Sequence, residues 1–153
     1  MSISIKHKKK LAVAIALSLM SASTVYAMPK GGSVQTGNVT LNGAAATTLN
    51  PVSGDTIANT TNALINWNAF NISSGNTLNF NTKAGTILMN QVTGNTATNI
   101  LGTLKDAGSG SLWICNPNGI LVGAGAVIQP YALTLATIQN LHSVQYIPLY
   151  EPL

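Results

Sequence analysis

The side chains of this 153-residue chain that could carry out acid–base or nucleophilic chemistry are few and far apart. A reactive thiol needs a base beside it, and after residue 27 the only histidine is His142, in a stretch of different character from the rest. Cys115, the only cysteine, follows Leu112-Trp113-Ile114, so we expect it to be a small buried hydrophobic residue that forms no disulfide within the chain. The sequence has no paired carboxylates, Gly-x-Ser-x-Gly elbow, metal-ligand spacing or phosphate loop. It predicts no enzyme, no metal and no cofactor.

The charge of the chain excludes a nucleic-acid partner. Lys+Arg is 7 and Asp+Glu is 3, for a formal net charge of +4. Four of the lysines lie between residues 6 and 10, and there is no arginine. The remainder of the chain has balanced charges and no basic face that could displace counterions from phosphates.

The first 27 residues are typical of a secretory signal peptide. A basic segment is followed by an apolar run, Leu11 to Met20, and by a small-x-small cleavage site that ends at Ala27. The alternative is a membrane anchor, but about ten strongly apolar residues fall short of the roughly twenty that a spanning helix needs. We therefore predict cleavage between Ala27 and Met28, export, and no permanent membrane anchor.

After the leader, the composition predicts an all-β fold. Thr, Ile and Val favour strands, whereas Gly and Asn favour turns. No segment sustains the apolar period of a helix. Short apolar segments repeat about every ten residues, which suits a sandwich, a barrel or a stacked solenoid. Uncharged Asn and Thr favour the solenoid, because stacked amides and hydroxyls can form ladders where like charges would repel. The apolar segments are residues 63–65, 77–80, 86–89, 100–104, 112–115, 120–122 and 126–128.

The sharpest local signal is the turn sequence Asn116-Pro117-Asn118-Gly119. Proline sets φ at the second position of a tight turn, the first asparagine can bond back to the backbone, and glycine closes the turn. Asn and Gly lie outside the apolar segments, so we expect the turn to be exposed and tolerant of substitution. Two further motifs precede it in a fixed order: Asn66, Trp67 and Phe70, whose aromatic rings we expect to pack in the core, and then Val92, Thr93 and Gly94.

This succession of motifs, from about Ser33 to Ile128, resembles the N-terminal secretion domain of the filamentous haemagglutinin family, the exported partners of two-partner secretion in Gram-negative bacteria. The resemblance implies a right-handed parallel β-helix in an extracellular, non-enzymatic adhesin or related exoprotein. It implies recognition in the periplasm by a dedicated outer-membrane β-barrel transporter, and then secretion or display at the cell surface. It also implies that the turn belongs to a segment important for export, and that the two preceding motifs are structural.

The resemblance divides the chain into a signal peptide (residues 1–27), a β-helix domain (28–129) and a divergent C-terminal tail (130–153). Gln91 stands where the family usually has arginine, and the likeness fades after Gln129. Pro148 and Pro152 cannot donate to a strand ladder, which suits a tail. We therefore expect a truncated copy of the family domain. The alternative is a free-standing secreted β-solenoid, a surface adhesin or structural protein that binds host cell-surface ligands or self-associates through its open ends.

Overall fold

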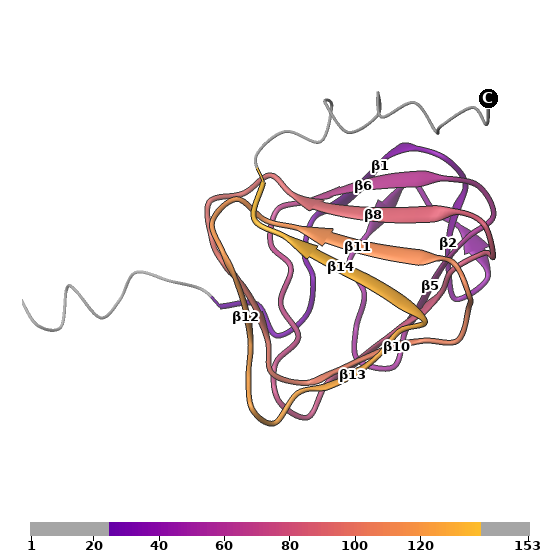
Figure 1. Cartoon of the computed structure of the whole chain (residues 1–153). Coiled ribbons are helices and arrows are strands. Elements are labelled where there is room, and N and C mark those ends of the chain that lie inside the picture. The colour runs from indigo at the N-terminus through magenta and orange to yellow at the C-terminus, as the bar shows by residue number, and fades with distance from the viewer. Residues whose placement is uncertain (1–24, 139–153) are drawn as a thin grey trace, which may run out of the picture.

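The computed structural model describes residues 25–138, and every regular element in that range is a β-strand (Figure 1). The strands wind into coils that stack as a parallel β-solenoid, so the predicted fold class is confirmed. Within the described range no helix is long and apolar enough to cross a membrane.

Three sheets form the sides of the solenoid. Sheet 1 contains, in spatial order, β14 (Ala132–Ala136), β11 (Ser111–Cys115), β8 (Ile87–Val92), β6 (Ala63–Trp67), β1 (Gly32–Thr36) and β4 (Thr48–Leu49). Sheet 2 contains β13 (Val127–Gln129), β10 (Thr103–Asp106), β7 (Thr77–Asn81), β5 (Thr56–Asn59), β2 (Val39–Leu41) and β3 (Ala44–Ala45). Sheet 3 contains β12 (Ile120–Val122) and β9 (Thr98–Ile100).

The register of the parallel strands brings equivalent side chains of successive coils together. In sheet 1, Leu112 of β11 pairs with Leu88 of β8 on one side and with Leu133 of β14 on the other. In sheet 2, Leu104 of β10 pairs in the same way with Leu78 of β7 and Ile128 of β13. Alternate residues of each strand point inward, so these columns form the core between the sheets.

The amino-terminal end of the solenoid is closed by antiparallel strands, which the sequence did not predict. β1 pairs antiparallel with β4 and β6, and β2 pairs antiparallel with β3 and β5. β2 and β3 are joined by Asn42 (φ 51°) and Gly43 (φ 84°). A two-residue Asn-Gly connection with positive φ at both positions is the favoured turn of a tight hairpin.

The predicted boundary of the β-helix at residue 129 is too early. Residues 132–136 form β14, which continues the stack with five parallel register pairs to β11, from Ser111↔Ala132 to Cys115↔Ala136. Leu112 and Leu133 lie side by side there, as register partners do in earlier coils. Pro130 lies just before the strand, where its missing N–H does not disturb the ladder. The rest of the predicted tail, from residue 139, lies outside the described residues.

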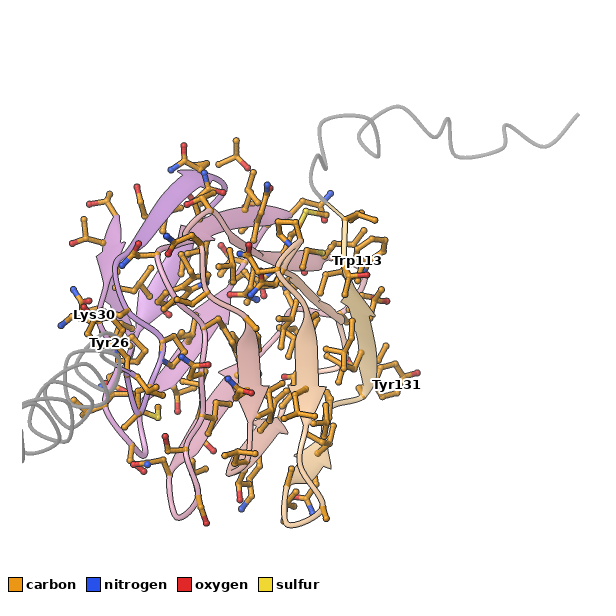
Figure 2. The ribbon with its side chains drawn as sticks, turned by 90° about the vertical axis from the view of Figure 1, so that its left-hand side faces the viewer. Tyr26, Lys30, Trp113 and Tyr131 are labelled. Atoms are coloured by element: carbon orange, nitrogen blue, oxygen red, sulfur yellow. The ribbon has the colours of Figure 1, made fainter. Side chains whose placement is uncertain are left out.

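The two ends of the described range lie on opposite sides of the stack. Figure 2 shows Tyr26 and Lys30 beside the indigo amino-terminal strands, and Trp113 and Tyr131 among the orange and yellow strands of the last coils. Parallel strands of one sheet end at the same edge, so the segments that follow β6, β8 and β11 come together at one corner of the solenoid.

Candidate functional site

At that corner lies an open surface pocket of about 730 Å³, which we call the corner groove. Three successive coils contribute to it, each through the end of its strand of sheet 1 or the segment that follows that strand. The groove therefore brings together two sequence motifs, Val92-Thr93-Gly94 and the turn at Pro117 and Asn118, that are separated along the chain. The lining residues are Asn68, Gln91, Val92, Thr93, Gly94, Asn95, Pro117 and Asn118.

The turn sequence closes as its residue types predict. The backbone N–H of Asn118 donates to Oδ1 of Asn116 at 2.9 Å, and the N–H of Gly119 donates to the carbonyl of Asn116 at 3.2 Å. Gly119 has φ of 112°, a conformation that favours glycine. Pro117 and Asn118 are exposed at the tip of the turn.

Asn116 itself is fully buried, which corrects the expectation that the whole turn is exposed. Its Nδ2 donates to the carbonyl of Thr96 and to Oγ1 of Thr98, both at 2.9 Å. Both acceptors belong to the preceding coil. The side chain points inward because β12 pairs with β9, so the turn that leads into β12 crosses over the segment that leads into β9.

Position 94 needs glycine because the backbone of another coil lies too close to leave room for a Cβ. Its backbone angle does not itself require glycine. A Cβ on this residue would lie 1.9 Å from the carbonyl oxygen of Asn68 in the coil below. On the other side, the carbonyl of Gly94 accepts a hydrogen bond of 2.8 Å from Nδ2 of Asn118 in the coil above. Asn68, Gly94 and Asn118 therefore form a continuous contact through three coils.

Val92 and Thr93 have different roles beside this contact. The side chain of Val92 is buried in the core. Thr93 is exposed, and both its N–H and its Oγ1 donate to the carbonyl of Trp67, at 2.8 and 3.2 Å. Thr93 thus holds the segment after β8 onto the end of β6.

Trp67 and Phe70 lie in the core beneath the groove, where both rings are fully buried. They pack edge to face, with ring centroids 5.6 Å apart and an angle of 83° between their planes. Nε1 of Trp67 donates to Oδ1 of the buried Asn90 at 2.9 Å. Asn66 precedes Trp67 on β6 and is half-buried on the opposite face of the strand. Its buried Oδ1 has no hydrogen-bond partner among the described residues.

The predicted cleavage site lies outside the groove. Ala27 is exposed, and its carbonyl accepts a hydrogen bond of 2.8 Å from the N–H of Ser73. Met28 is half-buried and packs against the core. The first residue that would remain after cleavage is therefore already part of the folded unit.

The ionisable groups of the described range do not gather at the groove. Burial raises the pKa of the Cys115 thiol to about 11, because desolvation penalises the thiolate. His142 lies outside the described residues. Within residues 25–138 no group of three His, Cys, Asp or Glu side chains could hold a metal ion. What the groove offers chemically is hydrogen bonding by neutral amide, hydroxyl and peptide groups.

Comparisons with known proteins point to the same part of the chain. The profile of a family described as "TPS secretion domain" matches residues 25–145. A search of curated proteins found no match. Among solved structures, the crystal structure of the HMW1 secretion domain from Haemophilus influenzae is similar, with a TM-score of 0.62 and 29% sequence identity. That alignment covers 73% of this chain and 28% of the HMW1 chain.

Proposed function

The chain belongs to the family of two-partner secretion (TPS) domains, and from this premise we propose that its solenoid is the module by which an outer-membrane β-barrel transporter selects the protein for export. The protein is a secreted substrate of the two-partner type, as its motifs predicted. Transport recognition, passage through the periplasm and the cleavage of a leader at Ala27 are parts of the proposal.

The observation that carries the proposal is the convergence of two motifs on the corner groove. The fold needs Asn116 and Gly94 for contacts inside the stack. It makes no comparable use of Pro117 and Asn95, which are exposed beside them. Residues that are exposed, adjacent and set on a rigid scaffold are suited to recognition by a partner.

The test is secretion in cells that carry the cognate transporter. We expect Pro117→Ala combined with Asn95→Ala to lower the secreted amount several-fold, while thermal unfolding of the purified variant stays close to that of the parent. The matched control is Asn81→Ala, at an exposed position at the end of β7. Normal secretion of the folded double variant would contradict the role of the groove, and secretion independent of any transporter would contradict the function.

We further propose that the exported protein is an adhesin. It would bind host cell-surface ligands and catalyse no reaction. Support comes from the scarcity of ionisable groups in the described range, where no group of three His, Cys, Asp or Glu side chains gathers, because binding needs no such groups and catalysis usually does. Binding of labelled protein to host cells, with loss of binding on treating the cells with protease or glycosidase, would test this role. Turnover of a substrate by the purified protein would contradict it.

A second candidate, a free-standing solenoid that self-associates, is favoured by one feature. Apolar side chains are exposed on the last strands of the described range, and Leu121 is 56% exposed. Burying such side chains between copies would be favourable. Light scattering separates the candidates, because self-association predicts a mass that rises with protein concentration without a transporter. The other exposed apolar residues of this group are Val122, Val127 and Leu135.

A further inference from the structure

We propose that the corner groove binds an extended, uncharged peptide segment of the transporter, held through the main-chain amide groups of that segment. This inference rests on the function proposed above and names the chemistry of its partner. Two observations support it: some polar groups of the groove form no hydrogen bond within the described residues, and the lining carries no charge.

The groove keeps several hydrogen-bonding groups available. The backbone N–H groups of Gly94 and Asn95 have no backbone acceptor within residues 25–138. The side-chain amides of Asn68, Gln91 and Asn95 line the groove. A side-chain amide has both a donor and an acceptor, as a peptide group has. An extended chain could therefore be matched along its backbone, whatever its side chains are.

Two other polar side chains of the lining already form hydrogen bonds within the protein. Nδ2 of Asn118 donates to the carbonyl of Gly94, and Oγ1 of Thr93 donates to the carbonyl of Trp67. These bonds fix the walls of the groove, so its free donors are presented in a set geometry. Pre-organised donors lower the ordering cost of binding.

The lining carries no charged side chain. Lys30 meets the lining residue Asn68 through its backbone, since its carbonyl accepts a hydrogen bond of 3.0 Å from the N–H of Asn68. The side chain of Lys30 is not part of the lining. The carboxylate of Asp106 is bound elsewhere, by Thr82 and Gly108. A charged ligand group placed in this groove would be desolvated without a partner of opposite charge, which is costly.

A neutral glycan is the other class of ligand that amides could bind. Sugar rings commonly stack their apolar faces on aromatic side chains, but none lines the groove. The aromatic rings nearest in sequence, Trp67 and Phe70, are fully buried. The apolar surface that is present comes from Val92 and Pro117, which suit the small contacts of a peptide chain better than the face of a sugar.

The test measures binding of the mature, full-length protein to its cognate outer-membrane transporter, purified in detergent. The dissociation constant should change by less than about twofold between about 0.1 M and about 1 M NaCl, over which the Debye length falls from about 10 Å to about 3 Å. Lys30→Gln should leave this salt profile unchanged.

Charge introduced into the groove gives a second readout. Asn95→Lys and Asn95→Asp should both weaken binding by about tenfold, which is about 1.4 kcal/mol, because either charge would face uncharged main chain. The matched controls are Asn81→Lys and Asn81→Asp, which add the same charges at the exposed end of β7 and should not change binding.

The outcomes separate this inference from the proposed function. Steep salt dependence, or opposite effects of the two Asn95 variants, would overturn the neutral-peptide inference and leave transporter recognition standing. Binding that neither variant affects would also overturn it. Binding competed by neutral oligosaccharides would assign the groove to glycans instead. The absence of any binding to the transporter would overturn the proposed function and this inference together.

Discussion

The side chain of Asn116 joins two coils of the solenoid, because both ends of its amide are used within the protein. Oδ1 accepts from the backbone of the following turn, and Nδ2 donates to two groups of the preceding coil. The exposed tip of the same turn, Pro117, makes no such bonds. Two neighbouring residues of one motif therefore have different physical roles, the first in stability and the second at the surface.

We expect Asn116→Ala to lower the free energy of unfolding by about 1–3 kcal/mol, because it leaves buried partners without hydrogen bonds. Pro117→Ala, in the same turn, should change it by less than about 1 kcal/mol, chiefly through the unfolded chain. Urea denaturation of the mature protein measures both values. Equal effects of the two substitutions would show that the buried amide contributes nothing beyond the turn itself.

The thiol of Cys115 predicts an alkaline loss of stability. Burial raises its pKa from 9.0, the ordinary value of a free thiol, to about 11 in the folded protein. Between these values the unfolded chain has lost the proton that the folded chain keeps, so stability falls as the pH rises. The loss should reach up to about 3 kcal/mol. It is measured as the difference in pH dependence between the parent and Cys115→Ala, in which this component should be missing.

At the scale of the element, the strands that the sequence revealed are those of the repeating coils. The apolar segments predicted at 77–80, 112–115 and 126–128 correspond to β7, β11 and β13. They were recognisable because both the inward period of the strand and the turn residues between strands are visible in the residue types.

The amino-terminal strands were missed because they carry few apolar residues. β1 contains one large apolar side chain, Val34, and β3 consists of two alanines. Their position in the sheets depends on antiparallel pairing with strands far along the chain, and no local sequence pattern indicates such pairing. The hairpin signal Asn42-Gly43 was the one local clue.

The corner groove could not be predicted, although the motifs that form it could be singled out. Its formation depends on the register between coils, which places Asn68, Gly94 and Asn118 in contact. The burial of Asn116 follows from the same register and has no signal in the turn sequence itself. Residue types thus predicted the turn, and only the stacking decides which of its faces is exposed.

β14 gives a prediction about local stability. β8 and β11 each pair with a strand on both sides, whereas β14 has one partner, β11, within the described range. Native-state hydrogen exchange should therefore be slowest in β8 and β11, and faster but still protected in β14. Amides of residues 132–136 that exchange as fast as those of an unfolded peptide would contradict the stacking of β14 on β11.

At the scale of the whole molecule, the leader and the solenoid make a joint prediction about processing. Protein recovered from the medium or the cell surface should have an intact mass that begins at Met28. The packing of Met28 against the core leaves the new amino terminus anchored. Removal of residues 1–27 deletes only the hydrogen bond from Ser73 to the carbonyl of Ala27 among the described contacts of that segment, so it should lower the melting temperature of the purified protein by no more than about 5 °C. Recovery of uncleaved chain in the inner membrane alone would contradict the predicted leader.

The antiparallel strands at the amino-terminal end also imply an order in which the coils of the solenoid fold. Each later coil contacts only the coils beside it, so it has a surface to form on only once its predecessor is in place. β1 to β6 already combine a closed edge with a buried core, which makes them the natural nucleus. A chain delivered from its amino end would complete this nucleus first and then add coils one by one. The entropic cost of ordering would be spread over the whole delivery. Once β1 had paired with β4 and β6 in the nucleus, each later step would join only neighbouring coils.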